Sequence, residues 1–166
     1  MKRSDQLIIA SRAICVYGLV DSRAPLFIKH VGSTTYGAKR GLERMYEAFQ
    51  KKYSNLMRSS GYLDTSKLSE RERWFTLMAQ VRAKNDHTAH IKAIPLYGCV
   101  SKEELALATP RITVTLLELG MANLHTEAQR KAMIHKVDQS SYRLNPEHFY
   151  TPLIQILNQV ELFDPA

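Results

Sequence analysis

The strongest constraint on the fold is a set of apolar residues at helical spacing in the first third of the chain, over residues 42–53. They recur at intervals of three and four, so they share one side of a helix, and the opposite side is charged. This is the pattern of a helix that packs one face against a core, and a serine and two threonines at positions 33–35 are alternative N-caps. The apolar residues are Leu42, Met45, Tyr46, Phe49 and Tyr53.

The rest of the chain shows similar helical signals. Two Ser-x-x-Glu capping boxes, at Ser69–Glu72 and Ser101–Glu104, each open an apolar run. Pro110 is expected to kink or split the second of these helices, and residues 54–66 read as a linker. Helices are predicted at 5–20, at 22–31 with Ser22 as N-cap, near 69–81, near 87–98, from Ser101 to Gly120, from Thr126 to about Val137, and after Asn145–Pro146.

The predicted fold class is therefore all-α. Three short helices in the first third, joined by small turns, have the arrangement of a helix-turn-helix unit. We predict a basic helix-turn-helix unit over residues 1–58 and a helical interaction or dimerisation lobe over residues 59–166. A short strand at the β-branched run Ile112–Thr115 is the less favoured alternative there.

The positive charge is concentrated in one segment. The net charge is +7, and residues 23–58 hold eight basic residues against two acidic ones. Six of the seven net positive charges thus lie in this segment, as expected for a protein that binds a polyanion. An ordinary solvated helix face is the alternative interpretation.

A helix-turn-helix reads DNA with the outer N-terminal half of its second helix, where cations reach guanine acceptors or phosphates. The residues predicted in that half are Thr34, Thr35, Tyr36, Lys39, Arg40 and Arg44. The predicted phosphate contacts outside it are Lys29, Lys51 and Lys52.

Other kinds of site are not supported by the residues. The segment 32–39 lacks the Gly-Lys-Ser/Thr ending of a phosphate-binding loop, and no Ser/His/Asp, Cys/His or paired-carboxylate arrangement stands out. His87 and His90 share a predicted helix face without further fixed ligands, so solvated histidines are expected. No apolar run approaches the ~20 residues needed to span a bilayer. We expect a cytoplasmic protein without enzymatic activity, cofactor or membrane association.

The order of these segments resembles a known family. The chain is similar to the C subunit of the flagellar master transcriptional activator (FlhC) and its relatives on mobile elements, collinearly over about residues 5–124. The stretches that carry the resemblance are LERMYEAF at 42–49, IKA at 91–93 with LY at 96–97, and LAL at 105–107 followed by Val114, Glu118, Gly120 and Leu124. The resemblance implies a DNA-binding activator that works with a small helical D subunit and contacts RNA polymerase.

The four-cysteine zinc site of that family has no counterpart here. After Leu124 the chain continues with His125, and no cysteine follows Cys99. Structural zinc sites rely on thiolates, so we predict no metal, and a helical apolar lobe in place of the zinc lobe. Cys15 and Cys99 are expected to be buried or inert thiols. The apolar residues expected in this lobe are Met133, Val137, Phe149, Tyr150, Leu153, Ile154 and Leu157.

The sequence thus predicts a sequence-specific regulator of transcription, most simply an activator, that binds double-stranded DNA. The alternative is a helical adaptor or inhibitor whose basic face meets an acidic protein partner without touching DNA. The two differ in whether the face with Lys39, Arg40 and Arg44 protrudes from the molecule.

Overall fold

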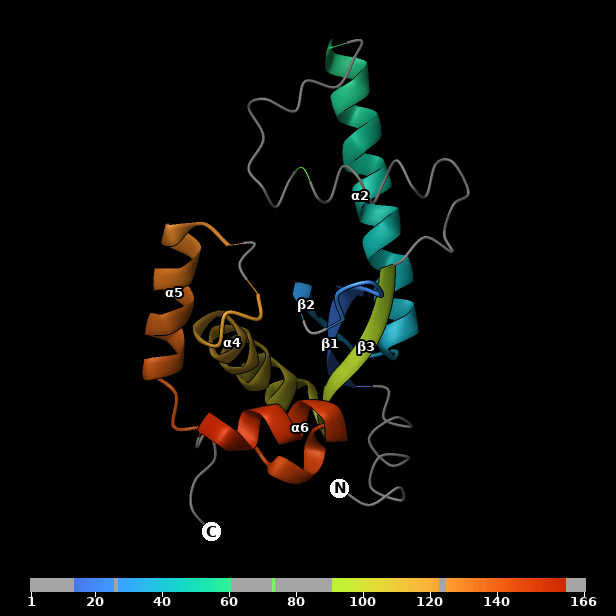
Figure 1. The fold of residues 1–166 in the computed structure, drawn as a ribbon. Helices are drawn as coiled ribbons and strands as arrows, with labels where there is room; N and C mark the ends of the chain where they lie inside the picture. The colour runs from blue at the N-terminus through green and yellow to red at the C-terminus, as the bar shows by residue number, and fades with distance from the viewer. Residues whose placement is uncertain (1–13, 26, 61–72, 74–90, 123–124, 161–166) are drawn as a thin grey trace.

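An antiparallel sheet of three strands lies between layers of helices (Figure 1). The computed structural model describes residues 14–25, 27–60, 73, 91–122 and 125–160. The strands are β1 (Cys15–Asp21), β2 (Ile28–Thr34) and β3 (Ile91–Gly98), in the order β2-β1-β3. β1 is the central strand and pairs with both neighbours, Tyr17 lying opposite Gly32 on one side and Pro95 on the other.

One long helix and several shorter ones surround the sheet. The helix α2 (Ala38–Ser60) follows β2 directly, and α4 (Lys102–Glu118) follows β3. The chain then forms α5 (Glu127–Asp138), a 3-10 turn at Pro146–His148, α6 (Thr151–Leu157) and a last 3-10 turn at Asn158–Val160.

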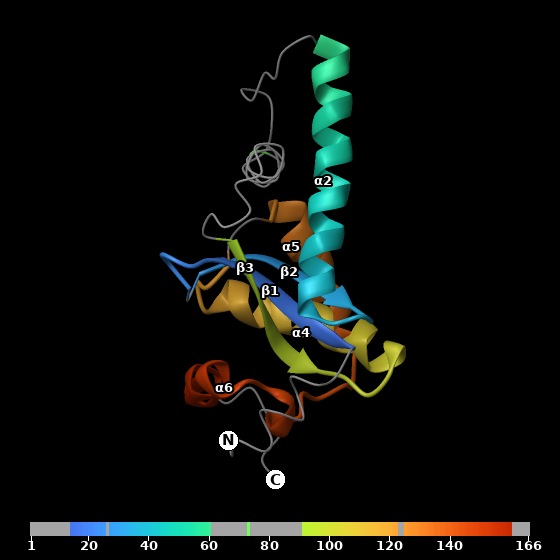
Figure 2. The same ribbon diagram turned by 90° about the vertical axis from the view of Figure 1, so that its right-hand side faces the viewer.

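The sheet has a buried cluster on each of its faces. On one face Tyr17 and Leu19 of β1 contact Tyr46, Leu42 and Met45 of α2. On the other, Val16 and Val20 belong to a larger cluster with Ile112 and Leu116 of α4 and with Phe149 and Leu157 near the C-terminus. The two views in Figures 1 and 2 show α2 on one side of the sheet and α4 on the other.

The all-α prediction is wrong, and with it the helix-turn-helix at the N-terminus. Residues predicted as parts of two helices, 5–20 and 22–31, contain instead the hairpin of β1 and β2. The error arose because Cys15–Val20 is buried on both faces of the sheet. A strand covered on both faces reads as a continuous apolar run, which has no strand periodicity and fits a helical stripe equally well.

The predicted helix near 87–98 is also wrong over its described part. Residues 91–98 form β3, the edge strand beside β1, and Tyr97 of β3 also forms an isolated antiparallel bridge with Phe149. Pro95 has no N–H to donate, and proline in a sheet is confined to edge strands and bulges. The pairing register shifts at this point, between Val16 and Tyr17 of β1, so the proline sits beside a bulge.

Several local signals are confirmed. The amphipathic pattern at 42–53 lies in α2, although the helix continues to Ser60 where a linker was predicted. Ser101 and Thr126 cap α4 and α5, and Gly120 follows α4 with a φ of 69°. Pro110 does not split α4. Asn145 caps only the short 3-10 turn, after which α6 begins at Thr151. The predictions for residues 5–13 and for the helix near 69–81, apart from Arg73, fall outside the described residues.

The sheet takes strands from both sides of the predicted division at residue 58. β1 and β2 precede it, whereas β3 follows it and pairs with β1 along its whole length. The core is therefore shared by residues on both sides of this division. In the C-terminal part the predicted apolar residues Phe149, Leu153, Ile154 and Leu157 are indeed buried, whereas Met133, Val137 and Tyr150 are only half-buried.

The ring of Tyr17 connects the sheet to α2. Tyr17 is almost fully buried, and its hydroxyl donates to the carbonyl oxygen of Gly41 at 3.4 Å. A Cβ placed on Gly32 of β2 would lie 2.5 Å from this ring, and one on Gly41 would lie 2.6 Å from it. Both glycines are thus needed for the close approach of α2 to the sheet.

Substitution Gly41→Ala should destabilise the protein by about 1–3 kcal/mol, because the new methyl group overpacks against the Tyr17 ring. In a Tyr17→Ala background the same change should be neutral or stabilising, since alanine favours a helix interior by up to about 1 kcal/mol over glycine. Urea unfolding of the four proteins in this cycle measures both effects. Equal effects of Gly41→Ala in the two backgrounds would contradict the packing described here.

Candidate nucleic-acid interface

The turn between β2 and α2 is held in one conformation by its own side chains. Thr34 is buried, and its hydroxyl oxygen accepts a hydrogen bond from the backbone N–H of Tyr36 at 3.1 Å. Gly37 has a φ of 91°, a left-handed conformation that favours glycine. Its carbonyl oxygen accepts the first helical hydrogen bond, from Gly41. Thr34 therefore shapes the turn, while Tyr36 projects from it.

Tyr36 and Arg44 form an exposed pair at this end of α2. The Tyr36 side chain is 64% exposed, and the guanidinium carbon of Arg44 lies 5.1 Å from the centre of its ring. This is the distance of a cation–π contact, in which the positive charge lies against the face of the aromatic ring. Arg44 is itself exposed, so the pair presents both an aromatic surface and a cation to solvent.

Arg40 lies on the same face of α2 and is engaged by two glutamates of the helix. Its guanidinium is 3.1 Å from Glu43 and 3.5 Å from Glu47, and all three side chains are more than 40% exposed. The hydrogen bond with Glu43, followed by the charge of Glu47, raises the pKa of Arg40. Exposed ion pairs contribute little to stability, so a phosphate can compete for this guanidinium.

The predicted DNA-contact residues are only partly brought together. Tyr36, Lys39, Arg40 and Arg44 gather at the N-terminal end of α2, next to Thr35 in the turn. Lys51 and Lys52 are exposed on the same helix, twelve residues beyond Lys39 and Arg40 and so about 18 Å further along the helix axis at 1.5 Å per residue. Lys29 lies at the other end of β2, with its ammonium 4.9 Å from the centre of the Phe27 ring.

A buried aromatic pair beneath this surface was missed by the sequence analysis. The rings of Tyr17 and His30 lie 6.3 Å apart on the face of the sheet that α2 covers. Burial, with a smaller effect of Cys15, raises the pKa of Tyr17 to about 12, so its phenol stays protonated at neutral pH. The signal that could have found Tyr17 is the pair Gly32 and Gly41, which leave room for its ring.

A second polar cluster connects α4 to the C-terminal segment. The hydroxyl groups of Tyr97 and Tyr142 lie 2.7 Å apart, and Tyr142 donates to Glu104 at 3.1 Å. Glu104 also lies 3.3 Å from His148, and the Tyr97 hydroxyl oxygen accepts from the N–H of Asn145. Burial is the largest cause that raises the pKa of Tyr97 and of Tyr142. These groups bind one another across the fold, which is a stabilising arrangement.

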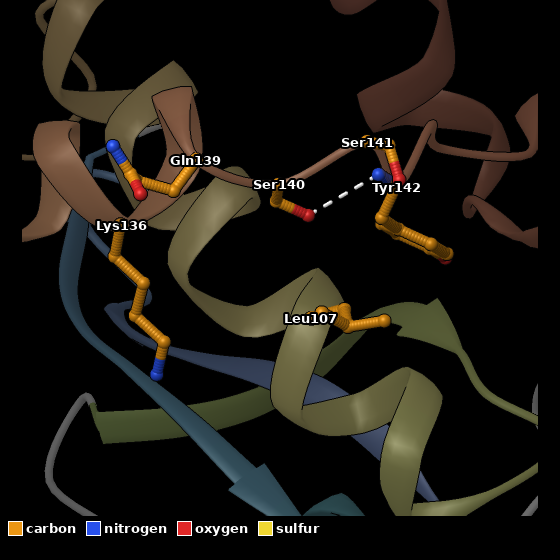
Figure 3. A pocket seen from close by; sticks show the side chains of 6 residues that line it. All are labelled: Leu107, Lys136, Gln139, Ser140, Ser141 and Tyr142. Atoms are coloured by element: carbon orange, nitrogen blue, oxygen red, sulfur yellow. Dashed lines mark hydrogen bonds between the residues drawn. The ribbon is translucent and has the colours of Figure 1, made fainter.

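A groove between α4 and the segment after α5 lies beside this cluster. It encloses about 550 Å³. Figure 3 shows the lining side chains, with the N–H of Tyr142 donating to the Ser140 hydroxyl at 3.2 Å. Its one charged lining residue is Lys136, and it offers no paired acid and base for catalysis. The lining residues are Leu107, Lys136, Gln139, Ser140, Ser141 and Tyr142.

Metal ligands do not gather in the described part of the chain. Within it, no group of three or more histidine, cysteine or acidic residues is placed to hold a metal ion. His87 and His90 lie outside the described residues. Cys15 and Cys99 are both buried free thiols, as expected from the sequence.

Comparison with known proteins leaves the chain without an assigned family. No family model, curated protein or solved structure matches it significantly. The resemblance to FlhC accordingly stays a prediction, and a β-hairpin stands where the spacing of apolar residues predicted the first helices of a helix-turn-helix. Among the helices of the described residues, none is both long and apolar enough to cross a membrane.

Substitution Tyr97→Phe should lower the free energy of unfolding by about 1–3 kcal/mol, because it removes two part-buried hydrogen bonds of the hydroxyl group, one with Tyr142 and one with the backbone N–H of Asn145. The matched control is Tyr36→Phe, which removes a hydroxyl group from an exposed ring and should change stability little. Urea unfolding compares the two variants. Equal losses would contradict a stabilising role for the Tyr97 cluster.

The cysteines should be unreactive in the folded protein at pH 8. Burial raises the pKa of the Cys15 thiol to about 11, so little of the reactive thiolate is present. Both Cys15 and Cys99 should react with a disulfide reagent at least tenfold more slowly than in denaturant. Fast labelling of the native protein, followed by absorbance and located by peptide mapping, would contradict their burial.

Proposed function

We propose that this protein is a non-enzymatic DNA-binding protein that contacts the duplex through α2. The observation that carries the proposal is the position of Lys39, Arg40 and Arg44, which are all exposed on one helix. The C-terminal half of that helix extends beyond the sheet in both views, and α6 lies at the opposite end of the molecule (Figures 1 and 2). Lys39, Arg40 and Arg44 lie in the N-terminal half of α2, which packs on the sheet, and their side chains are exposed there, whereas Lys51 and Lys52 lie on the half that extends beyond the sheet.

The shape and charge of α2 support this proposal. Its 23 residues span about 34 Å, close to one turn of B-form DNA, and an α-helix fits the major groove. The helix carries six basic and two acidic residues. The sheet, rather than a pair of helices, would hold it against the DNA, with phosphate contacts from Lys51 and Lys52 and base contacts near its start.

We propose that this DNA binding serves to regulate transcription. A binding surface without a catalytic constellation acts by occupying DNA and by recruiting or excluding other proteins. The resemblance to FlhC suggests a small helical partner subunit and RNA polymerase as the proteins recruited. A sequence preference in the DNA would support this step.

One observation favours the alternative, a protein-binding adaptor. The exposed face of α2 is mixed in sign, since Arg40 is flanked by Glu43 and Glu47 and binds both. Alternating charges of this kind also suit recognition of a complementary protein surface, where they set specificity. The adaptor hypothesis predicts that neutralising these cations weakens a protein complex and leaves DNA binding unaffected or absent.

A variant in which glutamine replaces Lys39, Arg40 and Arg44 should bind duplex DNA at least tenfold more weakly. It should also reduce the slope of log affinity against log salt concentration by about 2–3, because each cation removed from the interface lowers the number of counterions released from the DNA by about one. Fluorescence anisotropy at several salt concentrations measures both quantities.

The matched control replaces three exposed lysines of α4 and α5, Lys102, Lys131 and Lys136, with glutamine. It removes the same net charge from helices on the other side of the sheet, and it should leave most of the affinity. Unchanged binding in the α2 variant, or equal losses in both variants, would contradict a DNA interface on α2.

A further inference from the structure

We propose that Tyr36 and Arg44 form a stacking site for an unpaired nucleobase at the N-terminal end of α2. The preferred ligand would then be duplex DNA with an adjoining single-stranded nucleotide, such as an overhang or an open base pair. This inference rests on the proposed DNA binding and specifies the form of DNA that the same surface recognises.

The exposure of Tyr36 is the first observation behind this site. Four large apolar side chains of the described residues are strongly exposed, and Tyr36 is the aromatic one among them. Exposing an aromatic ring to water is unfavourable unless a ligand covers it, and tyrosine is a common stacking platform for bases. The other three, Val100, Leu107 and Ile134, lie outside the β2–α2 turn.

The position of the ring is fixed in advance, which lowers the entropy lost on binding. The buried Thr34 holds the backbone N–H of Tyr36, and Gly37 turns the chain into α2 directly after it. Arg44, two helical turns into α2, lies against the ring at 5.1 Å. Because Arg44 lies over one face of the ring, a base can stack on the other face, with the guanidinium on the far side of the ring.

The surrounding charges suit the phosphates of the same nucleotide. Lys39 and Arg40 lie in the first turn of α2, within four residues of Tyr36, and both are exposed. The weak ion pairs of Arg40 with Glu43 and Glu47 can open to admit a phosphate oxygen. Bases inside a duplex are stacked on their neighbours, so the face that Tyr36 needs is free only in an unpaired nucleotide.

Binding to three DNA probes that share one sequence tests this site. The probes are a blunt duplex, the same sequence with a five-nucleotide single-stranded overhang, and a fully single-stranded form, with the fluorescent base 2-aminopurine in the overhang. The native protein should bind the overhang probe at least tenfold more tightly than the blunt duplex, and stacking should quench the 2-aminopurine fluorescence. Equal affinity for the overhang and the blunt duplex would overturn the inference.

Variants of Tyr36 separate stacking from general apolar contact. Tyr36→Phe should keep the overhang preference because the ring remains. Tyr36→Leu should abolish the quenching and the preference, so that the variant binds the overhang probe and the blunt duplex with equal affinity. The matched control is Leu107→Ala, which removes an exposed apolar side chain of α4 and should change neither. Unfolding curves of all variants check that they are folded.

The outcomes also separate this inference from the proposed function. If the native protein binds the duplex but Tyr36→Leu leaves the overhang preference intact, the stacking site is wrong and DNA binding stands. If no probe binds at low salt, the proposed function fails and the stacking site fails with it. Tyr36 would then belong to a protein interface, where tyrosine and arginine often dominate the binding energy.

Discussion

The structure depends on the contact of one aromatic ring with two glycines. Tyr17 points from the central strand into the space between β2 and α2, where Gly32 and Gly41 leave room for its ring. The contact brings the first turns of α2 close to the sheet, and Leu42, Met45 and Tyr46 complete the apolar seam. With this face of the helix buried, its charged residues are directed to solvent.

The opposite face of the sheet provides most of the core, and it is held by polar as well as apolar contacts. Strands and helices far apart in the chain meet there, and the cluster of Tyr97, Glu104, Tyr142 and His148 ties α4 to the segment before α6. The hydrogen bonds from Tyr97 to Tyr142 and from Tyr142 to Glu104 specify a single arrangement of the surrounding elements. The C-terminal segment is thereby kept away from α2, so the basic face stays uncovered by it.

The charge on α2 is less uniform than the composition of residues 23–58 suggests. The charge of Arg40 is partly neutralised by its ion pair with Glu43 on the same helix, whereas the guanidinium of Arg44 lies over the ring of Tyr36. Both interactions are weak and exposed, which leaves the cations available and arranged in advance. Under the proposed function, a phosphate chain with one accessible base would match this arrangement better than a bare anionic surface, because the base would cover the second face of the Tyr36 ring.

The sequence by itself determined the local features of this protein: the amphipathic helix α2, the N-caps at Ser101 and Thr126, the glycine that follows α4, and the concentration of charge around α2. These follow from short-range spacing and from hydrogen bonds within a few residues. The tertiary structure decided what single segments leave ambiguous. Residues 15–20 became a strand because both faces of the sheet are covered, and residues 91–98 became one because an edge beside β1 accepts a proline. The pairing of Tyr36 with Arg44, and the burial of Thr34 beside them, likewise depend on how the hairpin meets α2, since packing across the fold overrides local preference.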